Sequence, residues 1–148
     1  MTTTRPSPRT ARVLSYQEAH RLLEEALRKA TEIGVPASVA ILDAAREVVA
    51  FGRQDGAPLL TGEVATAKAY TSASLRQPTG GLAEATSPSG PFFGLAQGSS
   101  RALITFAGGF PLMVNDDVVG AIGASGGSLE QDETIARAAV DLFQGWNQ

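Results

Sequence analysis

Cysteine is absent from this sequence of 148 residues, and histidine occurs only once. The absence of cysteine excludes disulfide bonds, thiolate metal ligands, iron–sulfur clusters and a cysteine nucleophile. With a single histidine, a zinc or iron site would have to use carboxylates, and no spacing typical of metal ligands is present. We therefore expect no dedicated metal site built from the side chains of this chain.

Long apolar runs and an excess of positive charge are missing as well. No run approaches the roughly 18 residues that a membrane-spanning helix needs, so we expect no membrane association. The net charge is −3, from 12 basic and 15 acidic residues, which argues against nucleic acid as a partner. Residues 1–13 are polar and lack the apolar core of a secretory signal. We predict that they form a disordered N-terminal tail and that the protein is cytoplasmic.

The rest of the chain predicts one folded domain over residues 14–148, because a chain of this length can bury a single core. A capping box at Ser15, followed by apolar residues at helical spacing, predicts a helix over residues 15–33. A second capping box at Ser128 predicts a final helix that runs to about Gly145.

Short apolar runs bounded by turn residues predict five strands between these helices. They cover residues 37–42, 48–53, 101–107, 111–114 and 118–125. Thr61 is expected to cap a further helix that ends near Leu75. Hairpin-linked strands with helices at both ends and one after the second strand predict an α+β fold, a five-stranded antiparallel sheet layered with helices.

Residues 76–100 form a long irregular segment rich in proline and glycine. A segment of this length inside a small domain is usually functional or disordered. Phe92 and Phe93 indicate that part of it packs back onto the domain. We expect the segment to roof a pocket, with these two aromatic residues among the groups that contact a ligand.

Arg53, Asp55 and Lys68 are the group of residues best placed for chemistry, at a strand end, in the following turn and in the next helix. An arginine fork holds a carboxylate or phosphate, and a lysine adds a point charge or an acid–base amine. Thr61 and Ser72 lie on the same helical face as Lys68. We expect the three charged residues to converge on one cavity. The alternative is a structural ion pair of Asp55 with Arg53 or Lys68.

Gly126 and Gly127 join the last predicted strand to the last helix. Backbone N–H groups in such a turn, with the helix N-terminus, can bind an anion. The stretch lacks the lysine of a P-loop and the spacing of a dinucleotide fingerprint, which argues against a nucleotide. The alternative is a tight turn with no ligand.

Several segments together resemble a known family. They are VAILD (39–43), VVAFGRQDGA (48–57), AKAYTSA (67–73), GGFPLMV (108–114) and VVGAIGASGGSLEQDETIARAAV (118–140). The sequence resembles the GlcG/HbpS family, also met as the C-terminal domain of PduO-type proteins. The resemblance implies a profilin-like or PAS-like sheet layered with helices. It also implies a homo-oligomer, a tetramer or octamer, and haem as a candidate ligand.

His20 is the first candidate for a haem ligand, because haem iron takes an axial donor such as histidine, tyrosine or methionine. It lies at the margin of the apolar stripe of the first predicted helix. Tyr16 and Tyr70 are weaker candidates, and Met113 is expected in the core. The alternative for His20 is a surface residue with no ligand.

Two functions follow from these observations, beside a third possibility, a structural or interaction protein with no ligand. The first is a cytoplasmic, oligomeric binding domain for a small anionic ligand, with haem named by the resemblance. The second is a cofactor-independent enzyme, an isomerase, lyase or cyclase, that acts on a small carboxylate-bearing substrate. In the second, Lys68 and Asp55 would be the acid–base groups and Arg53 the anchor.

Overall fold

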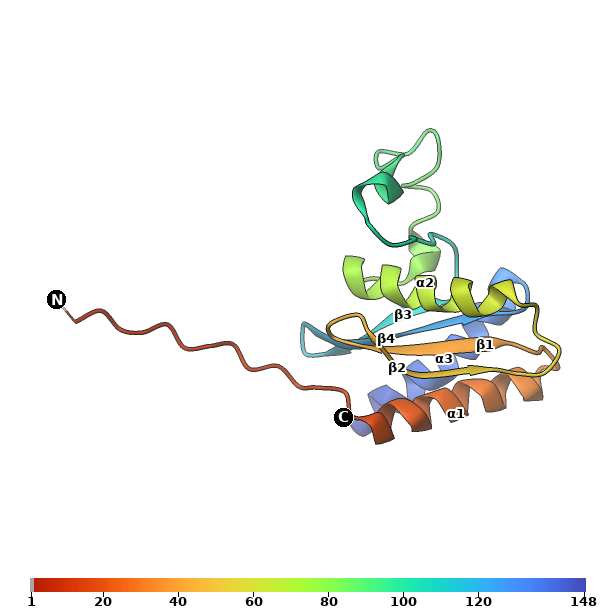
Figure 1. Ribbon diagram of the computed structural model, residues 1–148, viewed down its shortest axis with the longest axis horizontal. Coiled ribbons are helices and arrows are strands. Elements are labelled where there is room, and N and C mark those ends of the chain that lie inside the picture. The colour runs from red at the N-terminus through yellow and green to blue at the C-terminus, as the bar shows by residue number, and fades with distance from the viewer. Residues whose placement is uncertain (1) are drawn as a thin grey trace.

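The computed structural model of the chain describes residues 2–148. Its helices and strands are α1 (Tyr16–Glu32), β1 (Ser38–Asp43), β2 (Val48–Arg53), α2 (Leu60–Leu75), β3 (Gly109–Val114), β4 (Asp117–Ser125) and α3 (Leu129–Trp146). Residues 2–13 form no helix or strand and extend away from the domain (Figure 1). Within residues 2–148, no helix is long and apolar enough to cross a bilayer.

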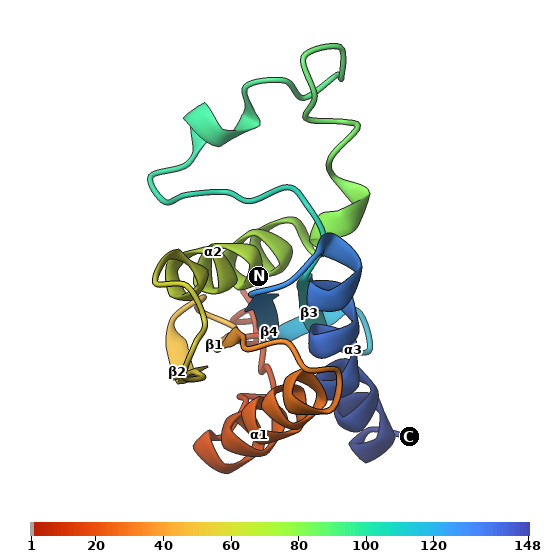
Figure 2. The ribbon, with the colours of Figure 1, turned by 90° about the vertical axis from the view of Figure 1, so that its right-hand side faces the viewer.

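The four strands make one antiparallel sheet in the order β2-β1-β4-β3. Helices α1 and α3 cover one face, and α2 lies alone across the other (Figures 1 and 2). The predicted α+β class and the antiparallel sheet are thus confirmed. The three-layer arrangement leaves β2 and β3 as edge strands and places the two sets of helices on opposite sides of the sheet.

The prediction of a fifth strand over residues 101–107 is wrong, because this segment is irregular. Its backbone bonds to α2 instead of to a strand, as the N–H of Ile104 donates to Thr71 Oγ1 over 2.9 Å. A run of apolar residues that packs on a helix has the same sequence pattern as a short strand. The sheet therefore has four strands, and the segment runs beside α2.

Both predicted capping boxes are present. Ser15 Oγ accepts from the N–H of Glu18, whose carboxylate accepts from the N–H of Ser15. Ser128 and Gln131 make the same reciprocal pair at the start of α3. Each cap satisfies two backbone donors that a helix start would otherwise leave without partners.

The expected cap of α2 is wrong. Helix α2 begins at Leu60, and its N-cap residue is Leu59, which makes no side-chain cap. Thr61 is inside the first turn, where its Oγ1 donates to Pro58 O over 2.6 Å and lies 2.8 Å from Ser38 Oγ. The hydroxyl of Thr61 therefore joins α2 to β1 instead of capping the start of α2.

The core has two parts, one on each face of the sheet. The larger part lies between the sheet and helices α1 and α3, and includes Leu22, Ile41 and Phe143. The smaller part lies under α2 and consists largely of alanines, with Leu42 and Tyr70. Small residues there let the α2 backbone approach the sheet closely, which gives the glycines and alanines of this region a packing role.

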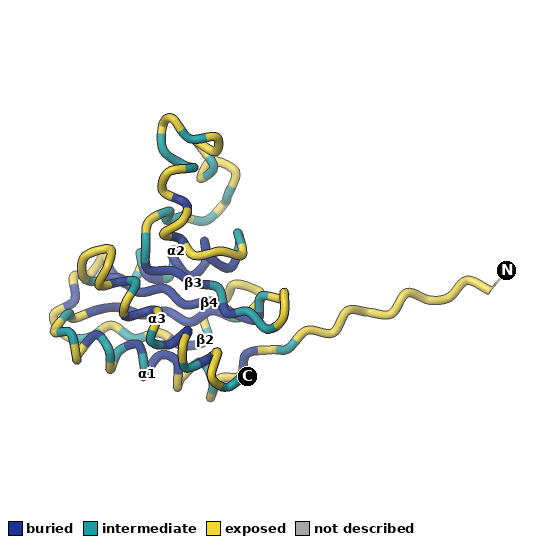
Figure 3. Tube along the Cα trace, turned by 180° about the vertical axis from the view of Figure 1, so that it is seen from behind, coloured by how far each residue is buried: buried dark blue, intermediate teal, exposed yellow. Residues whose placement is uncertain are grey.

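Residues 76–108, called here the arm, leave the end of α2 and project away from it before returning at β3 (Figure 2). The arm contains two short 3₁₀ turns, Thr79–Gly81 and Leu95–Gly98. The prediction that Phe92 and Phe93 pack back onto the domain is wrong, because they are 61% and 67% exposed. Much of the arm is exposed (Figure 3). Local backbone bonds within the arm hold it instead.

Candidate functional site

Lys68 lies in the interior of the domain, with none of its surface exposed. Its Nζ donates to Asp132 Oδ2 over 2.7 Å and to Ala124 O over 3.0 Å. Burial lowers the pKa of the Lys68 amine, and the bond to Asp132 opposes that shift. The other carboxylate oxygen of Asp132 accepts from the N–H of Gly127 over 2.9 Å. The pair is therefore buried and hydrogen-bonded on both sides.

Elements from both faces of the sheet build this pair. Lys68 comes from the middle of α2 and Asp132 from the first turn of α3, and they meet where β4 ends. The ring of Phe106, at the end of the arm, lies 5.1 Å from Nζ and adds a cation–π contact. Gly108 lies beside them with φ +124°, and a Cβ at this position would be 2.8 Å from Nζ. The site therefore requires a glycine there.

The structure does not bring Arg53, Asp55 and Lys68 together. The partner of Lys68 is Asp132, so the alternative of an ion pair of Asp55 with Arg53 or Lys68 is wrong as well. Asp55 lines a separate hollow of about 310 Å³ at the C-terminal end of α1. Arg53 lines a larger hollow beside α2 that does not include Lys68. Sequence reasoning missed Asp132, which is 64 positions away and carries no local signal.

Thr61 and Ser72 do share a face of α2 with Lys68, but that face packs on the sheet. Both residues are buried. Ser72 Oγ donates to Ala69 O over 2.9 Å, and the hydroxyl of Thr61 is engaged as described above. Both hydroxyl groups therefore make their hydrogen bonds within the protein, and this face of α2 is not open to a ligand.

The two-glycine turn is used internally. The N–H of Gly127 is taken by Asp132, so it does not point to an open anion site. Gly126 has φ +154°, and a side chain there would meet the backbone of Pro36 and Ala37. This geometry favours a tight strand-to-helix turn that positions the buried carboxylate.

A hollow of about 800 Å³ lies between the end of β2 and the first half of α2. Small and apolar residues line it together with Arg53, Glu63 and Arg101. The guanidinium of Arg101 lies 4.1 Å from the centre of the Tyr70 ring, and its Nη1 donates to Arg46 O over 3.0 Å. Arg53 makes no ion pair or side-chain hydrogen bond with any residue in the range 2–148.

Tyr70 lies between two guanidinium groups. Arg46 and Arg101 both stack on its ring, and Arg46 Nη1 donates to its hydroxyl over 3.2 Å. A hydrogen bond with Ser99 and the charges of the two arginines lower the pKa of the hydroxyl. The ring therefore holds Arg101 in place beside the hollow.

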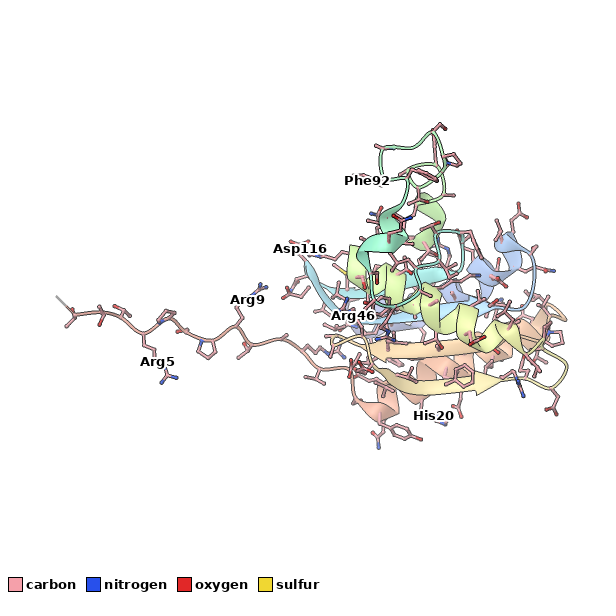
Figure 4. All side chains as sticks on the ribbon, turned by 45° about the horizontal axis from the view of Figure 1, so that its top comes forward. Arg5, Arg9, His20, Arg46, Phe92 and Asp116 are labelled. Carbon is pink, nitrogen blue, oxygen red and sulfur yellow. The ribbon has the colours of Figure 1, made fainter. Side chains whose placement is uncertain are left out.

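His20 lies on the outer surface of α1, on the far side of the sheet from α2 and the arm (Figure 4). Its side chain is 47% exposed, and Nε2 lies 3.2 Å from Glu24 Oε1. The ring stacks on Tyr16 with centroids 5.8 Å apart. The structure thus presents an accessible imidazole, separated from the arginine-lined hollow by the sheet.

Fold and site together define a class: a small α+β domain with helices on both faces of an antiparallel sheet and a buried Lys–Asp pair joining them. The model of the family described as haem-degrading protein HbpS-like matches residues 14–141. The chain belongs to this family, which confirms the resemblance found in the sequence.

Individual relatives agree with this assignment. The corrinoid adenosyltransferase PduO of Citrobacter freundii is 35% identical over 127 residues, which are 86% of this chain but 38% of PduO. The protein ORFY of Klebsiella pneumoniae superposes with a TM-score of 0.91 at 29% identity, covering 96% of this chain and 98% of ORFY. A PduOC:haem complex superposes with a TM-score of 0.83 at 32% identity, covering 87% and 94%.

Proposed function

We propose that this domain binds haem and that His20 is the axial ligand of the iron. Membership of a family described as haem-degrading and the likeness to a PduOC:haem complex support haem as the ligand. When bound, haem supplies a redox-active iron whose properties depend on its axial ligand and on the polarity of its surroundings. The role proposed for this chain is to bind haem and to hold its iron through an axial ligand.

The observation that carries this proposal is the accessibility of His20. Of the other side chains named as haem ligands, Tyr70 is buried beneath two arginines and Met113 is half-buried in β3, whereas Tyr16 is exposed beside His20 on α1. His20 has no such cover. Glu24 lies beside the imidazole, and carboxylates in this position orient ligating histidines. The donor set therefore fits haem at one place on α1.

Absorbance titration with ferric haem tests the proposal. We expect the wild-type protein to shift the Soret band with a saturating stoichiometry, and His20→Ala to lose the shift. Tyr16→Phe keeps the stacked ring and removes the hydroxyl of the rival donor on α1, so it should bind as the wild type does if His20 is the ligand. An unchanged titration of His20→Ala would remove His20 as the ligand.

We further propose that the domain functions in the cytoplasm as a homo-oligomer of four or more chains. Large apolar side chains of β2 and α2 that do not line the hollow are exposed, Val48 and Leu60 among them. The arm adds Phe92 and Phe93. Exposed apolar surface of this kind favours association with further copies.

The enzyme alternative needs Lys68 and Asp55 to reach one substrate. The structure favours it less, because Lys68 is enclosed and paired while Asp55 faces the small hollow at the end of α1. Arg53 remains a candidate anchor for an anionic ligand, since it lines the hollow of about 800 Å³ beside α2.

A further inference from the structure

The hollow between β2 and α2 has the size of a small-molecule site. Its volume is about 800 Å³, within the range of roughly 300–1,000 Å³ that is usual for ligand pockets. It lies on the α2 side of the sheet, whereas His20 projects from α1 on the other side. A ligand in this hollow would therefore not contact His20.

One part of the wall is apolar and lacks a packing partner. Phe51 lies against Gly62, where an added Cβ would be 3.1 Å from its ring. The ring nevertheless remains half-exposed, and Leu59 next to it is 78% exposed. Ala67 completes this wall from α2. A flat apolar group placed here would bury surface that the free chain leaves in water.

The other part of the wall carries two guanidinium groups. Arg101 is held by its stacking on Tyr70, by the bond from Nη1 to Arg46 O and by an ion pair of Nη1 with Glu47 Oε1 at 3.7 Å. Arg53, from the end of β2, has no partner within residues 2–148. Guanidinium groups stay charged at every physiological pH. Within residues 2–148, two arginines and one acidic residue, Glu63, line the hollow.

We propose that this hollow is a binding site for a monocarboxylic acid with a flat apolar body. Arginine forks bind a carboxylate through paired, charge-assisted hydrogen bonds, so Arg53 and Arg101 would hold the carboxylate. Phe51 and Leu59 would contact the body. Glu63 would repel a second carboxylate, which selects monoacids over diacids.

The test uses 2-naphthoate as the probe and 2-naphthamide, its neutral isostere, as the matched ligand. Both are titrated into the haem-free protein by calorimetry, so the outcome does not depend on whether His20 binds iron. We expect 2-naphthoate to bind at least about tenfold more tightly than 2-naphthamide, in line with the strength of charge-assisted hydrogen bonds. Equal affinities, or no binding of 2-naphthoate, would overturn the proposal.

Arg53→Gln is the decisive variant, because Arg53 is exposed and unpaired within residues 2–148, so the change should leave the fold intact. We expect it to weaken 2-naphthoate about tenfold. Arg137→Gln is the matched control, since Arg137 lines a different hollow and stacks on Phe110, and its affinity should equal that of the wild type. An unchanged affinity in Arg53→Gln, or an equal loss in both variants, would contradict the assignment.

Discussion

Lys68 Nζ lies 2.7 Å from Asp132 Oδ2, and the two side chains are 0% and 4% exposed. Because Lys68 belongs to α2 and Asp132 to α3, this one bond joins helices that cover opposite faces of the sheet. The pair also bonds to the end of β4 and to the turn that follows it, through Ala124 and Gly127. It therefore fixes how the three layers meet.

Lys68→Met should destabilise the protein by about 3–5 kcal/mol, because it leaves the Asp132 carboxylate buried without its counter-charge. Urea unfolding followed by circular dichroism measures this loss. Lys29→Met is the matched control, since Lys29 makes only a surface pair with Glu32, and it should cost at most about 1 kcal/mol. Equal and small effects of the two lysine variants would contradict a structural role for the buried pair.

Gly108→Ala should cost at least about 2 kcal/mol. The reason is twofold: φ is +124°, and the added Cβ would lie 2.8 Å from Lys68 Nζ and 2.7 Å from Ala124 O. Thermal unfolding compared with Gly98→Ala measures the effect, because Gly98 has no atom within 4 Å of an added Cβ and no positive φ. If Gly108→Ala and Gly98→Ala unfold at the same temperature, the close contact between Gly108 and the Lys68 amine does not exist.

The stability of the protein should depend on pH through Lys68. Desolvation lowers the pKa of its amine below 10.5 in the folded state, so between that lowered pKa and 10.5 the unfolded chain binds more protons. The free energy of unfolding contributed by this group therefore rises with pH across that window. Urea titrations at pH 8 and pH 10 should show the wild type gaining stability relative to Lys68→Met. A relative loss at pH 10 would mean that Asp132 raises the pKa more than burial lowers it.

The mass in solution should correspond to at least four chains, by multi-angle light scattering at micromolar concentration. The arm has one charged residue, Glu84, between Arg76 and Arg101, and its two phenylalanines are exposed. Replacing Phe92 and Phe93 together by serine should lower the measured mass and leave the helical circular dichroism unchanged. A monomeric wild type would show that this surface has no second copy as its partner.

Local signals in the sequence predict where α1 and α3 begin. Features that depend on bonds between residues far apart in the sequence could not be predicted in the same way. The capping boxes at Ser15 and Ser128 involve residues three positions apart, so the sequence alone locates both helix starts. Residues 101–107 were predicted as a strand because nothing local shows that Ile104 donates to Thr71, 33 positions earlier. Predicting that this segment bonds to α2 and not to a strand requires knowing where α2 lies.

The same distinction between local signals and distant contacts applies to the candidate site. The surface position of His20 could be predicted from the helical periodicity of its segment. The buried partner of Lys68 could not, because Asp55 is near in sequence whereas Asp132 is near only after the sheet has formed. Likewise, Arg101 was predicted only as a strand residue, and its role beside the hollow appears once it stacks on Tyr70.

The most direct measurement of the central claim, that an imidazole on α1 holds haem iron, is chemical rescue of His20→Gly. The variant is mixed with ferric haem, with and without millimolar imidazole, and the haem that co-elutes with protein in gel filtration is read from its Soret band. Free haem with imidazole is the control for ligation without protein. Our account predicts haem-free protein without imidazole and wild-type haem content with it. Full haem content in His20→Gly without imidazole would contradict it.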